Sequence, residues 1–92
     1  MATYYVTTPI YYITDVPHLG SAYTTIATDV LCRYRKLRGY DAYFLTGTDE
    51  HGLKIQRAAE ARGMPTQAHA DEISEKFREA WPQLACEPDY FI

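Results

Sequence analysis

The fold of this chain is decided within residues 4–46, which read YYVTTPIYYITDVPHLGSAYTTIATDVLCRYRKLRGYDAYFLT. Residues 4–8 are mostly aromatic or β-branched and precede Pro9, which predicts a strand that ends there. Apolar residues then recur at three- and four-residue steps between residues 19 and 34, which predicts a helix that ends at Gly39. Residues 40–46 predict a second, buried strand. Strand, helix and strand with short connections form a βαβ unit, so the expected fold class is α/β with parallel strands and flanking helices.

Three further segments follow this unit. Residues 51–62 predict a second helix, which Gly63 and Pro65 end. Thr66 is expected to cap a third helix, and Pro82 is expected to kink or end that helix near its last turn. Residues 88–92 look like the beginning of another apolar strand.

Helical periodicity also predicts the core. In the first helix the expected buried stripe consists of Leu19, Ala22, Tyr23, Ile26, Ala27, Val30, Leu31 and Tyr34. In the third helix it consists of Ala70, Ile73, Phe77, Ala80, Trp81 and Leu84. His69 is expected to be solvated. The basic residues within 33–38 are typical of a solvated helix end matched to the helix dipole, and a tRNA contact is the less favoured alternative.

Composition restricts the class of protein. The 92 residues are 47% hydrophobic and 23% charged, which is typical of one globular domain. A net charge of −3 gives no bulk attraction to nucleic acid. Cys32 and Cys86 are isolated, which predicts reduced, partly buried thiols and no zinc site within this chain. The sequence contains no apolar run of membrane length and no secretory signal, so a cytoplasmic protein is expected.

Two loops leave the predicted carboxyl ends of the strands, where parallel α/β sheets bind ligands. The first, residues 9–20, is unusually apolar, which indicates that it lines a pocket. It reaches the helix at His18, where free N–H groups and the helix dipole favour a phosphate. Gly20 would let a purine or sugar approach the backbone, and His18 could donate to a phosphate oxygen. The alternative for His18 is a helix cap or a surface residue.

The second loop, residues 47–52, reads GTDEHG. Asp49 could bind a substrate or cap the following helix, and spacing alone does not separate these roles. His51 is a weaker candidate for shaping the pocket. Between the two prolines of the first loop, Tyr12 is favoured as a pocket residue, and Tyr11 less clearly so.

Residues 7–30, TTPIYYITDVPHLGSAYTTIATDV, and residues 34–55, YRKLRGYDAYFLTGTDEHGLKI, closely resemble the opening of bacterial methionyl-tRNA synthetases. Residues 18–21, HLGS, fall where class I synthetases carry their HIGH signature, with Ser21 in place of the usual second histidine. The resemblance implies the first half of a Rossmann-type (HUP-like) nucleotide-binding domain. Residues 1–92 would then be the N-terminal part of the catalytic domain, without its remainder and without the anticodon-binding domain.

The resemblance also implies roles for individual residues. Ile10 and Tyr12 match positions that line the methionine side chain, and Asp49 matches the carboxylate that binds the α-ammonium. His18, Gly20 and Ser21 match the ATP-binding signature, with His18 and Ser21 as the catalytic residues. The implied reaction joins methionine to ATP, with Mg²⁺, as methionyl-adenylate, and then transfers methionine to tRNA(Met). No metal site is implied within these residues.

The KMSKS signature of class I synthetases does not occur in the 92 residues, so the isolated chain is expected to be inactive. Two other classes of function stay open. One is another class I synthetase or an adenylyltransferase with a HIGH-type site. The other is a non-catalytic binding module derived from a synthetase.

Overall fold

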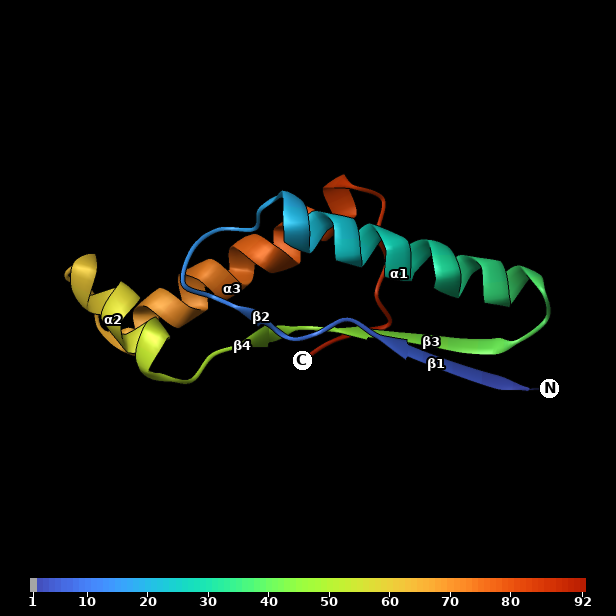
Figure 1. Cartoon of the computed structure of the whole chain (residues 1–92), viewed down its shortest axis with the longest axis horizontal. Helices are drawn as coiled ribbons and strands as arrows, with labels where there is room; N and C mark the ends of the chain where they lie inside the picture. Colours follow the sequence, from blue (N-terminus) through green and yellow to red (C-terminus); the bar gives the residue numbers. More distant parts are fainter. Residues whose placement is uncertain (1) are drawn as a thin grey trace.

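The computed structural model describes residues 2–92 and consists of a parallel sheet with the first helix along one face and the second helix beyond the ends of the strands (Figure 1). The main sheet has the strand order β1-β3-β5, and a second sheet pairs β2 with β4. Every pairing is parallel, which confirms the expected α/β class. The strands are β1 (Thr3–Thr7), β2 (Tyr11–Tyr12), β3 (Asp41–Thr46), β4 (Thr48–Asp49) and β5 (Tyr90–Phe91). The helices are α1 (Leu19–Leu37), α2 (Leu53–Ala61) and α3 (Thr66–Gln83).

The β1-α1-β3 unit forms as the sequence predicts. β1 pairs with β3 in one register from Thr3 opposite Asp41 to Thr7 opposite Leu45, and α1 packs against both strands. Helix α1 ends because Gly39 has a φ of 87°, a left-handed conformation that residues with a side chain rarely adopt. The predicted strand in the tail is β5, whose Tyr90 lies opposite Leu45 of β3.

The local structure differs from the prediction in three respects. Both segments expected to be loops contain a short strand, β2 in residues 9–20 and β4 in residues 47–52, because the two strands pair with each other and local sequence does not reveal that partner. Helix α2 begins at Leu53 and not at residue 51, because Gly52 adopts a φ of 116° immediately before it. Thr66 is the first residue of α3 and Pro65 occupies the capping position, so the prediction of a threonine cap was wrong.

The larger of two core clusters lies where α2, α3, the residue after β2 and the tail meet. Its buried members are Ile13, Ile55, Ala70, Ile73, Phe77, Trp81 and Cys86. A smaller cluster of Cys32, Ala42 and Phe44 packs α1 against β3. The predicted stripe of α3 is therefore confirmed for four of its residues, whereas Leu84 is 44% exposed because it follows the end of the helix. Pro82 lies within the last turn of α3, which ends at Gln83, as expected.

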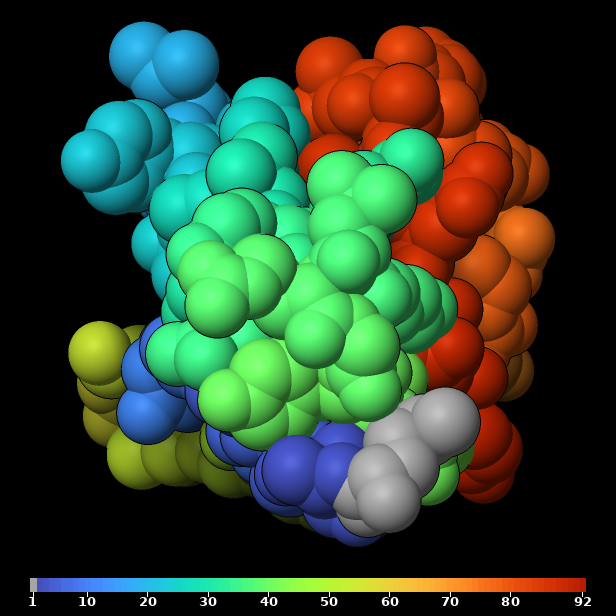
Figure 2. Space-filling view, turned by 90° about the vertical axis from the view of Figure 1, so that its right-hand side faces the viewer, coloured from blue at the N-terminus to red at the C-terminus, as the bar shows by residue number. Residues whose placement is uncertain are grey.

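Helix α1 turns the opposite side to the one that periodicity predicts. Its buried residues are Ser21, Thr25, Asp29 and Cys32, whereas Leu19 is 86% and Tyr23 is 76% exposed. The rest of the predicted stripe is also exposed, apart from half-buried Ala22. In Figure 2 the tail (red) covers one side of α1 (cyan to green), and the other side lies at the surface. The predictions that this stripe, Tyr23 and Tyr34 form the core were wrong.

The buried side of α1 is polar because each of its polar side chains has a partner. The Thr25 hydroxyl lies 2.8 Å from the Tyr11 hydroxyl. Asp29 accepts from the backbone N–H of Glu87 at 2.8 Å and from Arg33 at 2.7 Å. Buried polar groups with hydrogen-bond partners cost little compared with unpartnered ones, so this face can pack inward.

The basic end of α1 is only partly solvated. Arg38 is exposed, but the Arg35 guanidinium lies 4.7 Å from the ring centroid of Tyr4 and 5.0 Å from that of Tyr40. Guanidinium groups over aromatic faces are attracted by the ring quadrupole. These contacts hold the helix end against β1 and against the residue that precedes β3.

Three buried side chains complete the comparison. Cys32 and Cys86 are free thiols, as predicted, and burial raises the pKa of each. His69 is fully buried, so the prediction that it is solvated was wrong. Its ring is held between Arg62 and the carbonyl of Ile13, two residues whose approach to α3 depends on the tertiary structure.

Candidate active site

The two predicted ligand loops lie side by side at the carboxyl ends of β1 and β3. Short strands continue both: β2 follows β1, and β4 follows β3. Tyr12 of β2 pairs directly with Asp49 of β4, and the backbone N–H of Tyr11 donates to the carbonyl of Gly47 at 3.1 Å. Paired strands lie about 4.8 Å apart, so Tyr12 and Asp49 are immediate neighbours.

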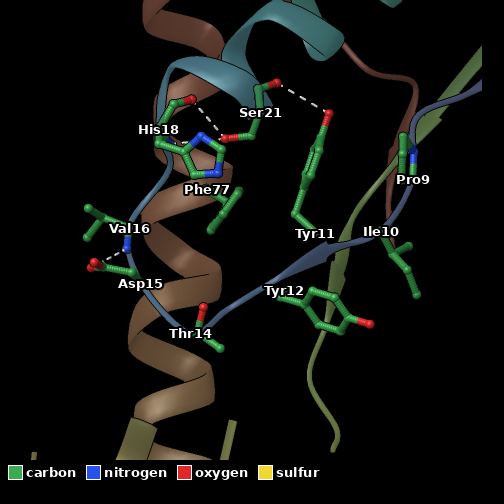
Figure 3. A pocket seen from close by; sticks show the side chains of 10 residues that line it. All are labelled: Pro9, Ile10, Tyr11, Tyr12, Thr14, Asp15, Val16, His18, Ser21 and Phe77. Carbon is green, nitrogen blue, oxygen red and sulfur yellow. Dashed lines mark hydrogen bonds between the residues drawn. The ribbon is translucent and has the colours of Figure 1, made fainter. Parts of the chain in front are cut away.

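A pocket of about 370 Å³ opens between the first loop and the start of α1. Figure 3 shows His18 and Ser21 in the upper part of this pocket, where α1 begins, with Ile10 on its right-hand side and Tyr12 toward its lower edge. The pocket is lined by Pro9, Ile10, Tyr11, Tyr12, Thr14, Asp15, Val16, His18, Ser21 and Phe77. The structure therefore brings four of the six predicted site residues around one hollow.

Asp49 lies in two adjoining hollows that share walls with this pocket. Tyr12 lines one of them and Ile10 the other. His51 lines both, in agreement with its expected role near the pocket, although its side chain is exposed. Ile10 and Tyr12 thus line both the pocket that contains His18 and the hollows that contain Asp49.

His18 is the residue that caps α1. Its Nδ1 accepts a hydrogen bond from the backbone N–H of Gly20 at 3.0 Å, so the capping alternative is realised. An accepting Nδ1 carries no proton, and the neutral ring then holds its proton on Nε2. Nε2 has no hydrogen-bond partner among residues 2–92, and the side chain is exposed. Capping therefore leaves the second nitrogen as a donor with a fixed direction.

Ser21 holds the backbone of His18. Its hydroxyl accepts from the His18 N–H at 3.0 Å and donates to the His18 carbonyl at 2.9 Å. The side chain is buried, and its one proton is used in the second of these bonds. In this arrangement Ser21 orients His18 and has no proton left to donate to a ligand.

Gly20 is required for the same geometry. A Cβ at this position would lie 2.8 Å from Cε1 and 3.1 Å from Nδ1 of His18. The glycine therefore lets the imidazole fold back over the first turn of α1.

Asp49 does not cap α2, because Gly52 occupies the capping position and no side chain bonds to the first turn of the helix. Its Oδ1 accepts from the backbone N–H of His51 at 3.2 Å. Its other carboxylate oxygen has no hydrogen-bond partner within the described chain, and the residue is half-buried. A half-buried carboxylate with one free oxygen is suited to an ammonium group.

Two neighbours of the site were not singled out from the sequence. Lys54 of α2 lies 5.6 Å from the ring centroid of Tyr12, and its place soon after the GTDEHG segment was the available signal. Phe77 was predicted only as a core residue, but it also lines the pocket and stacks on Tyr11 at 5.7 Å. Tyr11 is accordingly both a pocket wall and a core residue, with its hydroxyl directed at Thr25.

Two negative findings apply to the part of the chain that the structure describes. Residues 2–92 contain no group of three or more histidine, cysteine, aspartate or glutamate side chains that could hold a metal ion. No helix in the same range is both long and apolar enough to cross a membrane.

Comparisons with known proteins give one consistent family. The chain is 53% identical to the methionine–tRNA ligase of Thermotoga maritima and 57% identical to that of Synechocystis, over 97% and 89% of its residues. It covers only 14% and 15% of those two proteins. The structure of Mycobacterium tuberculosis methionyl-tRNA synthetase in complex with methionyl-adenylate matches with a TM-score of 0.98 and 50% identity. That match covers all of this chain and 18% of the solved one.

A leucyl-tRNA synthetase from Agrobacterium radiobacter, solved in a ternary complex, matches with a TM-score of 0.94 at 22% identity, which shows a shared fold. The observed parallel sheet with its helices corresponds to the first portion of the Rossmann-type catalytic domain of these enzymes. The family model described as tRNA synthetases class I (M) matches residues 4–92, and this chain belongs to that family.

Proposed function

We propose that this chain supplies the first part of the catalytic site of a longer methionine–tRNA ligase. Residues 1–92 would be the N-terminal part of its Rossmann-type domain, and the anticodon-binding domain would lie elsewhere in the polypeptide. The observation that carries the proposal is the pairing of Tyr12 with Asp49 beside the pocket of His18. The solved relative that contains methionyl-adenylate, at 50% identity, supports the same assignment.

In this proposal Ile10 and Tyr12 contact the apolar side chain of methionine. Both are more than half exposed in the chain by itself, at 51% and 59%, so their side chains are available to a ligand. The strand pairing places Asp49 next to Tyr12. The free oxygen of Asp49 then accepts a hydrogen bond from the α-ammonium group of the same methionine.

ATP binds where α1 begins. The N-terminus of the helix attracts its phosphates, and the Nε2–H of His18 donates to an oxygen of the α-phosphate. A methionine carboxylate oxygen attacks the α-phosphorus, and the bond to the bridging oxygen breaks to release pyrophosphate. Donors aimed at the charge that grows on phosphate oxygens lower the barrier, each by about 3 kcal/mol. Gly20 and Ser21 hold His18 for this step, while a direct contact of Ser21 with ATP stays a prediction.

Mg²⁺ would arrive with the ATP phosphates, since it is commonly bound through substrate phosphates and one or two carboxylates. The second step would transfer methionine to tRNA(Met) through surfaces largely outside these residues. We also propose that the protein works in the cytoplasm, where amino acid, ATP and tRNA are available together.

The test is amino-acid-dependent pyrophosphate exchange by the longer polypeptide that contains residues 1–92. Methionine should be the amino acid that supports exchange in a panel of all twenty. Asp49→Asn keeps the shape of the side chain but removes its charge, and it should lower kcat/KM for methionine by roughly ten- to a hundredfold, because hydrogen bonds to charged groups contribute about 1.5–3 kcal/mol.

Asp41→Asn is the matched control, since Asp41 is exposed at the opposite end of β3. It should leave exchange unchanged. Exchange that responds to a different amino acid would favour another class I synthetase or an adenylyltransferase. Absence of exchange with every amino acid would favour a non-catalytic module and would refute the proposed function.

A further inference from the structure

His69 is a fully buried side chain that links helix α3 to the first loop, residues 9–20. Its Nε2 lies 2.7 Å from the carbonyl oxygen of Ile13, and its Nδ1 lies 2.9 Å from Nη1 of Arg62. Ile13 directly follows Tyr12 and is itself fully buried. The residues proposed to bind methionine and ATP do not include His69, and it lines none of the hollows of the site.

The partners of His69 fix its proton. A carbonyl oxygen only accepts, so Nε2 must carry the hydrogen that it donates to Ile13. A guanidinium only donates, so Nδ1 must be the acceptor of the bond from Arg62. Arg62 is held in turn by Glu72 of α3 at 2.6 Å. Three hydrogen bonds therefore follow one another, from Arg62 to Glu72, from Arg62 to His69 and from His69 to the backbone carbonyl of Ile13 in the loop.

The Ile13 side chain also packs in the core, but few hydrogen bonds hold the loop beyond Ile13. Among the described residues, those numbered 14–17 make no hydrogen bond to another element, and the one side-chain bond there is local, from the Val16 N–H to Asp15. The next attachment is at His18, where Ser21 binds the backbone. Ile13 is thus the last anchored residue between β2 and the start of α1, and its carbonyl is the last backbone group there with a hydrogen bond to another element. Its position sets the direction of the loop walls between Tyr12 and His18.

We propose that His69 is a positioning residue for the methionine- and ATP-binding loop. It acts by holding the Ile13 carbonyl in the one orientation that the Arg62-fixed ring allows. This inference rests on the proposed function for its kinetic consequence, but its structural consequence for the loop does not depend on any activity.

Two substitutions in the longer polypeptide separate positioning from packing. His69→Leu fills the same space without a donor, and His69→Gln carries an amide N–H at a similar reach to Nε2. His69→Leu should raise the KM for methionine by roughly two- to tenfold, the range of one hydrogen bond, with a smaller change in kcat. His69→Gln should recover most of the loss.

The matched control is Ile73→Ala, which truncates a buried residue one turn further along α3. Ile73 belongs to the core cluster that also contains Ile13. It should lower the melting temperature and leave the KM for methionine unchanged. Hydrogen–deuterium exchange of the peptide covering residues 10–18 provides the second measurement. His69→Leu should speed its exchange, while His69→Gln and Ile73→Ala should not.

The possible outcomes are distinct. If His69→Leu and His69→Gln behave alike in both measurements, or if Ile73→Ala reproduces the change in the loop, then His69 acts only as packing and the inference is wrong. If the unsubstituted protein shows no methionine-dependent pyrophosphate exchange, the proposed function fails. Hydrogen–deuterium exchange of the loop alone then decides the role of His69. Faster exchange confined to the loop in His69→Leu would then still support positioning.

Discussion

Replacing His18 with asparagine separates the two tasks that the structure gives to this side chain. One is to cap α1 through Nδ1, which accepts from the Gly20 N–H at 3.0 Å. The other, in our proposal, is to donate from Nε2 to the α-phosphate. The asparagine side-chain oxygen can accept from the same N–H, because asparagine is among the best capping residues. It has no group that reaches the position of Nε2. His18→Asn should therefore keep the cap and lose the donor.

The magnitudes follow from counting these bonds. Loss of one donor to a developing charge costs about 3 kcal/mol, or roughly a hundred- to thousandfold in rate. Because that charge develops in the transition state, the loss should appear in kcat more than in KM. The unfolding free energy should change by no more than a few tenths of a kcal/mol. His18→Ala should show the same loss in rate and an additional loss of about 1 kcal/mol in stability, since alanine cannot cap.

The assay is methionine-dependent pyrophosphate exchange at saturating methionine and ATP, run beside urea unfolding of the same proteins. Exchange by His18→Asn at the unsubstituted rate would show that Nε2 is not a donor in the reaction. A rate for His18→Ala more than tenfold below that of His18→Asn would show that the cap also supports activity. Either result would refute the division of tasks between the two ring nitrogens.

Two further predictions concern the neighbours of His18. Gly20→Ala places a Cβ 2.8 Å from Cε1 of His18 and displaces the ring. Pyrophosphate exchange should fall at least tenfold, while the melting temperature should change by only a few degrees. An unchanged rate of pyrophosphate exchange would contradict the need for glycine here. Tyr11→Phe leaves the fully buried Thr25 hydroxyl without its 2.8 Å partner and should lower the free energy of unfolding by about 1–2 kcal/mol, measured by urea unfolding. Adding Thr25→Val to this variant should restore part of the lost stability. A Tyr11→Phe variant as stable as the unsubstituted protein would count against this contact.

The sequence predicted those parts of the fold that depend on neighbouring residues. Two strands and the helix between them follow from side-chain periodicity, and Gly39 ends that helix because of its own backbone conformation. The resemblance to synthetases supplied the site residues, and the structure placed Ile10, Tyr12 and Asp49 together through one strand pairing and two shared hollows.

Periodicity failed for α1 because it measures how apolar a stripe is and not what the stripe faces. The polar residues Thr25 and Asp29 lie inward because their partners, Tyr11 and the backbone of Glu87, come from other elements. The exposed position of Tyr23 follows from that choice. No property of the helix itself distinguishes a paired polar face from a solvated one.

His69 was missed for the same reason, since a histidine between helical positions looks solvated until Arg62 and the carbonyl of Ile13 are placed around it. The sequence by itself determined the α/β class and the order of the three helices and of β1, β3 and β5, whereas the roles of the site residues stay predictions. Only the tertiary structure decided which face of α1 is buried, which nitrogen of His18 is free and what holds the loop. The buried face of α1 and the hold on the loop depend on hydrogen bonds between residues far apart in the chain, and such bonds leave no local pattern. The free nitrogen of His18 follows from a local bond, in which Nδ1 accepts from the Gly20 N–H.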